Sequence, residues 1–174
     1  MRPSYSFVRL DPADPCVRQR YEEAFYASFG RVQANRLVRS LWLWDDEARR
    51  LATRIPYEEQ IIFAMSTADG QIETALALNV AMKSFQSDAF GFGKPEDPAG
   101  CFEVLTFFTA SDGHPAFKRQ LWREAVRVLR SSGYHTGFAT TAVRPLLAYL
   151  RLGWQVQRVA ILGDEVRFFL EYRL

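Results

Sequence analysis

The sequence of 174 residues is poor in the residue types from which disulfide frameworks, metal centres and membrane spans are built. It has two cysteines, Cys16 and Cys101, which lie far apart and outside any CxxC spacing, and only two histidines. These counts predict free thiols in a reducing compartment and no metal site. No apolar run approaches the roughly 20 residues of a spanning helix, and the N-terminus lacks the apolar stretch of a signal peptide. We therefore expect a cytoplasmic protein that does not enter a membrane.

The sequence also lacks a large excess of either sign of charge, because its net charge is only +2. A balance so close to zero gives no reason to expect a nucleic-acid partner. Lysine is rare, with Lys83, Lys94 and Lys118 as its three occurrences, so most cations are arginines suited to forked contacts with phosphates or carboxylates. GxSxG, HExxH and P-loop motifs are missing, which argues against the hydrolases and nucleotide-binding proteins that carry them.

What is present is an ordinary globular composition, with 48% apolar and 24% charged residues. This predicts a folded chain, organised as a single domain over residues 1–174. Apolar spacing predicts helices over 15–29, 37–51, 117–131 and 144–152. Runs rich in β-formers predict strands over 5–10, 60–66, 71–82, 102–109, 134–140, 154–162 and 165–172. A long loop, 84–100, remains between two strands, and loops of this length are often functional.

The predicted order is β-α-α-β-β-β-α-β-α-β-β. The strand–helix–strand unit over 102–140 requires a parallel, right-handed crossover, whereas the hairpins near both ends require antiparallel strands. The fold class is therefore α/β (α+β), with a mixed, mostly antiparallel central sheet of about seven strands. Helices should cover both faces of this sheet.

One segment near the C-terminus carries a chemical signal, because the helix LLAYLRLGW holds a single tyrosine and stops at Gly153 before Trp154. This segment, the element order and the terminal FFLEYRL resemble the GNAT superfamily of acyl-CoA-dependent N-acyltransferases. The resemblance implies acetyl-CoA or another acyl-CoA as co-substrate, and it implies Tyr149 as the general acid that protonates the leaving thiolate. Helical spacing alone favours Tyr149 as a core residue whose hydroxyl reaches solvent, and only the resemblance makes the catalytic role comparable.

The same resemblance places the pyrophosphate of coenzyme A in the loop after strand 102–109, where backbone N–H groups and a helix N-terminus bind phosphates. This loop departs from the family's pattern of Arg or Gln, two residues, Gly, one residue, then Gly or Ala. Pro115 has no N–H, Asp112 would repel a diphosphate, and a capped loop before an ordinary helix explains the same residues. The expected cofactor-binding residues are Thr109, Ala110, Ser111, Gly113, His114, Ala116, Lys118 and Arg119.

Acyl transfer to an amine also needs a base, because an ammonium group must lose a proton before it attacks. The resemblance favours Glu103 for this role, with Glu73 as another carboxylate and His114 or His135 as relays through water. The oxyanion of the intermediate needs a donor. In this fold that donor is a main-chain N–H of the central strand, expected within residues 107–110.

These features leave three functions open. The first is an N-acyltransferase, foremost an N-acetyltransferase, that moves an acyl group by direct attack from acyl-CoA to a small-molecule or protein amine. The second is a synthase of the autoinducer or N-acyl amino acid type that takes its acyl group from an acyl-carrier protein. The third is a non-catalytic binding or regulatory module, since fold does not entail function. Apolar terminal strands favour a homodimer.

Overall fold

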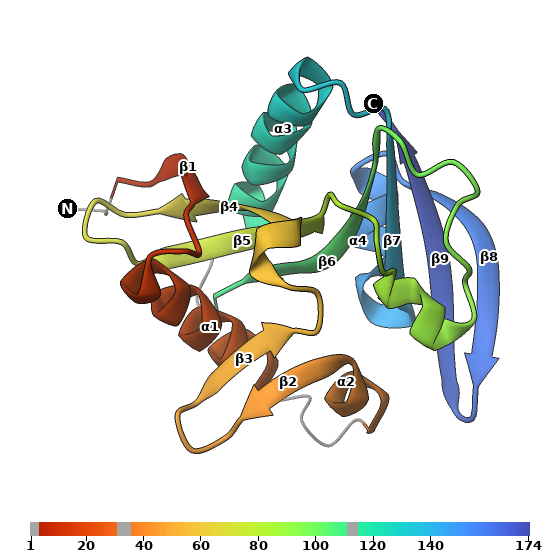
Figure 1. Cartoon of the computed structure of the whole chain (residues 1–174), viewed down its shortest axis with the longest axis horizontal. Coiled ribbons are helices and arrows are strands. Elements are labelled where there is room, and N and C mark those ends of the chain that lie inside the picture. The colour runs from red at the N-terminus through yellow and green to blue at the C-terminus, as the bar shows by residue number, and fades with distance from the viewer. Residues whose placement is uncertain (1–3, 31–35, 111–114) are drawn as a thin grey trace.

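The structure, a computed structural model, describes residues 4–30, 36–110 and 115–174. Within these ranges the main element is a seven-stranded sheet of order β1-β4-β5-β6-β7-β9-β8 (Figure 1). Only β6 and β7 are parallel, and every other neighbouring pair is antiparallel. The predicted mixed sheet is confirmed. The strands are β1 (Ser6–Leu10), β4 (Gln60–Ser66), β5 (Ile72–Asn79), β6 (Cys101–Thr109), β7 (Thr136–Ala142), β8 (Gln155–Leu162) and β9 (Glu165–Arg173).

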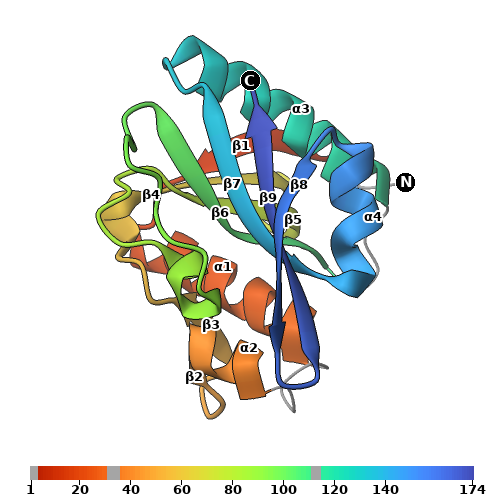
Figure 2. The ribbon, with the colours of Figure 1, turned by 90° about the vertical axis from the view of Figure 1, so that its right-hand side faces the viewer.

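Helices cover both faces of the sheet, as expected. One face carries α1 (Pro15–Phe29) and α2 (Arg36–Leu41), and the other carries α3 (Pro115–Ser131) and α4 (Val143–Arg151) (Figures 1 and 2). We call these the α1 face and the α3–α4 face. The start of α1 follows its sequence signal, because the Asp14 side chain accepts hydrogen bonds from the N–H groups of Cys16 and Val17, at 2.8 and 3.3 Å. Such a cap satisfies two of the unpaired donors at a helix start.

The core consists of two apolar layers, one on each side of the sheet. In β4, Ile62 and Ala64 belong to the layer under α1, while Phe63 and Met65 belong to the layer under α3. Because successive strand residues point to opposite faces, a strand buried on both sides reads as a continuous apolar run. This explains why the sequence of β4 shows no clean alternation.

The predicted helix over 37–51 is wrong beyond Leu41. Residues Trp42–Asp45 (β2) and Arg50–Thr53 (β3) instead form an antiparallel hairpin. The apolar positions fit a helical period, but turn chemistry and packing favour the hairpin. The Asp45 side chain accepts a hydrogen bond from Ala48 N–H at 2.8 Å, a local bond that competes with helix formation. The Trp42 ring packs against α1, with its centroid 4.9 Å from that of Phe25.

In the three ranges that the structure describes, no helix is long and apolar enough to cross a membrane.

Candidate active site

The central strands separate at one end and leave a wedge between them. β6 and β7 pair only from Cys101 with Thr136 to Val104 with Ala139. Beyond that point the two strands diverge (Figure 1). The second half of β6 therefore has a backbone edge that pairs with β5 on one side and not with β7 on the other. An edge of this kind can bind an extended ligand through main-chain hydrogen bonds.

A bulge in β6 determines which side chains flank the wedge. The register between β5 and β6 shifts between Ala77 and Leu78, so that Leu105 has no partner in β5. This extra residue reverses the alternation of side chains. Thr106 consequently faces α1, where its hydroxyl lies 3.0 Å from that of Tyr21, and Phe107 joins the layer under α3 and α4.

The same strand provides main-chain donors for the wedge. Ala110 N–H donates to the carbonyl of Glu73 at 2.7 Å, so Ala110 is not a free donor within the expected range of 107–110. Because antiparallel pairing alternates with a period of two, the N–H groups of Phe108 and Thr106 also face β5. Those of Phe107 and Thr109 then face the wedge. Phe107 lies nearer the bulge and is the candidate oxyanion donor.

Tyr149 lies beside this edge on the α3–α4 face. Its ring contacts Phe107 and Trp154, with centroid distances of 6.2 and 5.7 Å. The side chain is buried, and its hydroxyl has no hydrogen-bond partner among the described residues. Burial raises the pKa of Tyr149, because a phenolate is poorly solvated there. The hydroxyl therefore stays protonated throughout the neutral range and is able to donate.

Glu103 occupies the opposite side of β6, on the α1 face, with none of its surface exposed. Its carboxylate accepts from the N–H of Gln86 and from the N–H and hydroxyl of Ser87, at 2.8, 2.8 and 2.7 Å. The Asn79 amide lies 3.4 Å away. Burial raises the pKa of Glu103 to about 7, while the hydrogen bonds from Ser87, Gln86 and Asn79 oppose that shift. A carboxyl with this pKa can exchange a proton near neutral pH.

A chain of hydroxyls connects this buried carboxyl to the wedge. The Ser87 hydroxyl, which donates to Glu103, also lies 2.7 Å from the hydroxyl of Thr140. Thr140 is the first residue of β7 beyond the last pair with β6, so it stands at the apex of the wedge, where the two strands begin to separate. Glu103, Ser87 and Thr140 thus form a continuous hydrogen-bonded path.

Sequence reasoning did not find the partners of Glu103. Gln86 and Ser87 belong to the 3-10 helix η3 (Gln86–Phe90) inside the loop 84–100. Gln86 also donates to the carbonyl of Leu105 at 3.1 Å, which ties this loop to the β6 bulge. The length of the loop was the only signal, and it did not distinguish one serine from another.

The expected cofactor loop is described only at its two ends, because Ser111, Gly113 and His114 lie outside the described residues. Thr109 ends β6, and its carbonyl accepts from the Ser28 hydroxyl at 3.3 Å. Ala116 and Arg119 are exposed in the first turns of α3. Lys118 instead lies against the sheet, with Nζ 4.5 Å from the centroid of the Phe107 ring.

The other residues expected as a base or proton relay do not share the position of Glu103 or lie outside the described residues. Glu73 lies opposite Ala110, near the open end of β6. His135 precedes β7 at the closed end, where its ring packs on Gly100 and its Nδ1 lies 3.0 Å from the Thr136 hydroxyl. His135 is therefore not brought into the wedge, and His114 lies outside the described residues.

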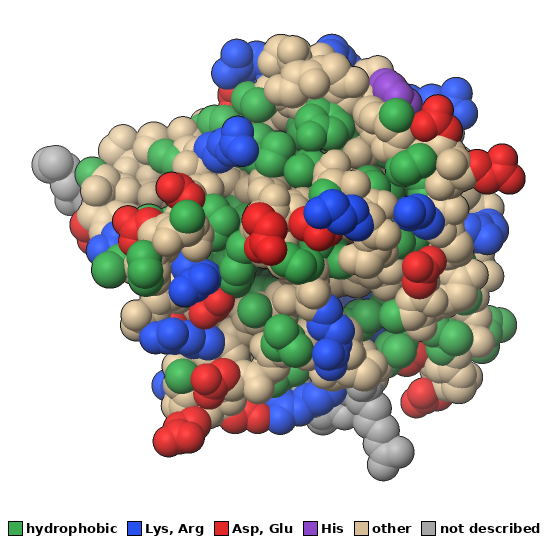
Figure 3. Space-filling model, viewed as in Figure 1, with side chains coloured by type: hydrophobic (Ala, Val, Ile, Leu, Met, Phe, Trp, Pro, Cys, Tyr) green, Lys and Arg blue, Asp and Glu red, His purple; other side chains and the backbone are tan. Residues whose placement is uncertain are grey.

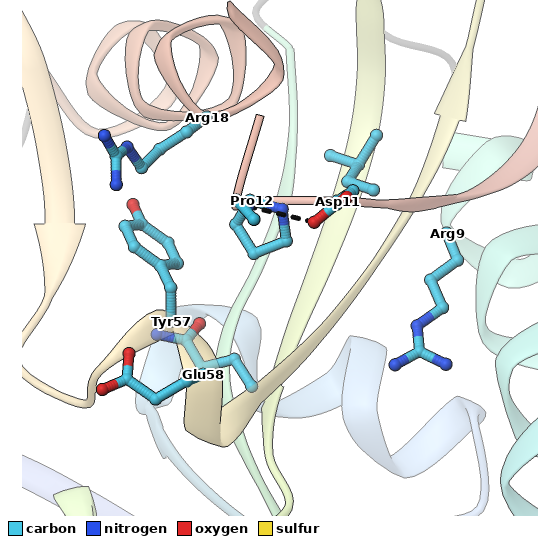
Figure 4. A pocket seen from close by; sticks show the side chains of 9 residues that line it. Arg9, Asp11, Pro12, Arg18, Tyr57 and Glu58 are labelled. Carbon is cyan, nitrogen blue, oxygen red and sulfur yellow. Dashed lines mark hydrogen bonds between the residues drawn. The ribbon is translucent and has the colours of Figure 1, made fainter. Parts of the chain in front are cut away.

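The surface also has a hollow away from the wedge. A hollow of about 540 Å³ lies between β1, the start of α1 and the 3-10 helix η2 (Tyr57–Glu59). There the Arg18 guanidinium faces the Tyr57 ring, 6.0 Å from its centroid, while Arg9 points away from both (Figure 4). This hollow contains none of the candidate residues. In the part of the chain that the structure describes, no group of three or more His, Cys, Asp or Glu residues could hold a metal ion.

Comparisons with known proteins agree with this geometry. No protein-family model matches the sequence, and no curated protein matches it either. Solved structures do match. The acyl-homoserine lactone synthase LasI superposes with a TM-score of 0.77 at 13% identity, over 99% of this chain and 91% of its own. BjaI, a CoA-dependent acyl-homoserine lactone synthase solved with SAM and isopentyl-CoA, gives 0.74 at 14%, over 99% and 83%.

A third match is an acetyltransferase of Bacillus subtilis in complex with CoA. It has a TM-score of 0.58 at 11% identity, over 98% of this chain and 99% of its own. The chain has the GNAT fold. At identities this low the likeness establishes the architecture alone. Within this GNAT fold, Tyr149 and the free edge of β6 lie together beside the wedge, and Glu103 reaches the wedge through Ser87 and Thr140.

Proposed function

We propose that the protein transfers an acyl group from an acyl thioester, with acyl-CoA as donor, to an amine. The observation that carries this proposal is the wedge between β6 and β7, which has a free main-chain edge and the unpartnered hydroxyl of Tyr149 beside it. A thioester in the wedge would meet hydrogen-bond donors on β6 and a protonated phenol on α4. Few other chemistries need this combination.

The two proton transfers of the reaction, from the amine and to the thiolate, take place on opposite faces of the sheet. Glu103 lies on the α1 face and reaches the wedge through Ser87 and Thr140. The amine gives its proton to this path, and its nitrogen attacks the thioester carbonyl. The N–H of Phe107 stabilises the oxyanion, as preorganised donors do in acyl transfer.

Collapse of the intermediate then breaks the carbon–sulfur bond. Tyr149, on the α3–α4 face, supplies a proton to the departing thiolate. The products are an amide and a free thiol. The proton that the amine gave to Glu103 passes to solvent, and the Tyr149 phenolate takes a proton from solvent, so both groups return to their starting state. General acid and general base catalysis contribute about 10²–10⁴-fold each.

A second candidate is a synthase of the acyl-homoserine lactone type. The observation in its favour is the TM-score, which is 0.77 and 0.74 for two such synthases but 0.58 for the Bacillus subtilis acetyltransferase. In this case the amine is that of S-adenosylmethionine, which is bound in BjaI. The donor is an acyl-CoA or an acyl-carrier protein.

Binding of the donor is the direct test of the proposal. We expect acetyl-CoA, a longer acyl-CoA or both to raise the melting temperature, because a ligand at 100 times its dissociation constant adds about 2.7 kcal/mol. Adding S-adenosylmethionine and an acyl-carrier protein to the panel separates the two candidates. If no acyl-CoA and no acyl-carrier protein binds, the protein is a non-catalytic module.

Turnover of the bound donor tests the role of Tyr149. Tyr149→Phe removes only the hydroxyl, so release of free thiol in the presence of an amine should fall about 10²-fold or more while acyl-CoA affinity is retained. Tyr134→Phe is the matched control, because Tyr134 packs on Phe102 before the closed end of β7. Equal turnover of Tyr149→Phe and wild type would remove Tyr149 as the acid.

A further inference from the structure

Lys118 differs from the two other lysines of the chain in its surroundings. Lys83 is exposed and pairs with Glu59, with 3.3 Å between Nζ and Oε1, and Lys94 is exposed as well. Lys118 is half-buried and forms no ion pair with any described residue. Its Nζ lies 4.5 Å from the centroid of the Phe107 ring. The structure thus places a primary amine on an aromatic ring inside the α3–α4 layer.

Burial favours the neutral form of this amine, against the attraction that the Phe107 ring exerts on an ammonium group. Burial lowers the pKa of Lys118 to about 8. The residue also lies in the first turn of α3, where the helix dipole disfavours a positive charge. The neighbours of the Phe107 ring on α3 and α4 are Trp122 and Tyr149, and neither is charged at neutral pH. At pH 7.5 roughly a quarter of such a group is neutral, about two hundredfold more than for an ordinary lysine.

The position of Phe107 connects this amine to the wedge. The main-chain N–H of Phe107 faces the wedge, and its ring contacts both Lys118 and Tyr149. A thioester that accepts a hydrogen bond from Phe107 N–H therefore has two side-chain neighbours on the α3–α4 face, a phenol and an amine. An uncharged amine next to a thioester is a nucleophile held near its electrophile.

We propose that Lys118 is a site of self-acylation, at which Nζ attacks the thioester carbonyl of a bound acyl-CoA. This inference rests on the proposed function, because it requires the donor to bind in the wedge. The Lys118 ammonium first gives one proton to solvent. The Nζ–carbon bond then forms, the carbon–sulfur bond breaks, and the second proton that the nitrogen loses as the amide forms passes to the thiolate. The products are an Nε-acyl-lysine and free CoA.

Acylation of Lys118 would alter the donor-binding site itself. Conversion of Lys118 to an amide removes its charge and adds an acyl group beside Phe107 and Tyr149, where the next donor would bind. Self-acylation should therefore lower the affinity for acyl-CoA and limit its own extent to one group per chain.

Mass spectrometry gives a direct test, because the chain has only three lysines. Purified protein is incubated with acetyl-CoA at pH 7.5, and the intact mass and the acetylated peptides are followed in time. We expect one acetyl group, on Lys118, formed about tenfold or more faster than on Lys83 or Lys94 because of its larger neutral fraction. Lys118→Arg should abolish the adduct, and Lys83→Arg should leave it unchanged.

A thermal-shift titration with acetyl-CoA accompanies this assay and separates the two ways to fail. Binding without an adduct on Lys118, or with equal labelling of the three lysines, overturns the self-acylation and leaves the proposed function standing. Absence of binding by acetyl-CoA, and by a longer acyl-CoA titrated in parallel, overturns both. The N-hydroxysuccinimide ester of acetic acid acetylates amines without a CoA site, so it measures the intrinsic reactivity of the Lys118 amine. Slower labelling of Lys118 than of Lys83 by this reagent would also overturn the inference.

Discussion

At Tyr149 and Glu103, burial raises the pKa of both side chains, but the two groups have different polar partners. The hydroxyl of Tyr149 has no partner among the described residues, so nothing competes with a ligand for its proton. The carboxyl of Glu103 is surrounded by donors and has no exposed surface, so it can exchange a proton with the wedge only through a neighbour. Ser87 and Thr140 are the neighbours in the correct place.

The relay gives a prediction at the scale of one residue. Thr140→Val replaces the hydroxyl by a methyl group of similar size and breaks the path at its outer end. We expect kcat/KM for the amine to fall about 10²-fold, as for the loss of a general base, with acyl-CoA affinity retained. Thr140→Ser should restore most of the activity, because it restores the hydroxyl, and the measurement is the release of free thiol at varied amine concentration.

Thr141→Val is the matched control for this prediction. Thr141 is the next residue of β7, and its hydroxyl contacts the carbonyl of Ala142, at 3.4 Å, rather than Ser87. Equal activity of Thr140→Val and Thr141→Val would show that protons do not leave through Ser87.

At the scale of elements, the position of Tyr149 depends on how α4 ends. Gly153 follows α4 with a φ of +96°, and the next residue, Trp154, donates its N–H to the carbonyl of Tyr149 at 3.2 Å. The turn therefore carries the chain from α4 to β8 while Trp154 packs against the Tyr149 ring. A Cβ at Gly153 would lie 3.2 Å from the ring of Tyr172.

Gly153→Ala should consequently lower both stability and turnover. A side chain in the left-handed region costs about 1–2 kcal/mol, and the contact with Tyr172 adds to this cost. Gly133→Ala is the control, since Gly133 has a φ of +86° with nothing within 4 Å of its Cβ position. We expect urea denaturation to show the larger loss for Gly153→Ala, and thiol release to fall for that variant alone. Equal effects would show that the Tyr149–Trp154 junction has no special role.

At the scale of the whole molecule, charged side chains of both signs are scattered over the surface in view, with apolar patches between them (Figure 3). Glu103 is a fully buried ionisable group whose pKa is raised into the neutral range, so its titration couples to the stability of the whole fold. Its pKa in the folded protein is about 7, above the ordinary value of 4.5 for a glutamate side chain. A carboxyl with a raised pKa favours folding below its unfolded pKa, and this contribution is lost as pH rises through the folded value.

Glu103→Gln removes this titration and tests its sign. The unfolding free energy of wild type relative to the variant should decrease between pH 4.5 and pH 7 by on the order of 3 kcal/mol. Urea denaturation of both proteins at several pH values measures the difference. Glu58→Gln removes an exposed carboxyl on η2 and serves as the control. A difference that stays constant over this range would contradict the proposed state of Glu103.

Local signals in the sequence predicted most of the elements but not all of them. The cap at Asp14, the period of α3 and the β-rich runs are confirmed because each reflects interactions between residues near in sequence. The hairpin β2–β3 was missed because Trp42 is placed by contacts with Phe25 on α1, which no local pattern encodes. The residues of the candidate site also fall into a group that the sequence predicted and a group that it did not. Tyr149 and Glu103 were predicted, whereas Ser87 and Thr140, which are 53 positions apart, were not.

The sequence by itself determined which faces are apolar, where α1, α3 and α4 lie, and that a tyrosine precedes Gly153 at the end of α4. Only the tertiary structure decided that β6 and β7 separate after Val104 and that the bulge at Leu105 turns Phe107 toward α4. It also decided that Lys118 lies on the Phe107 ring. The reason is physical: periodicity and capping depend on neighbours within one or two turns, whereas a wedge, a hydroxyl relay and the pKa of a buried amine depend on distant segments that pack together.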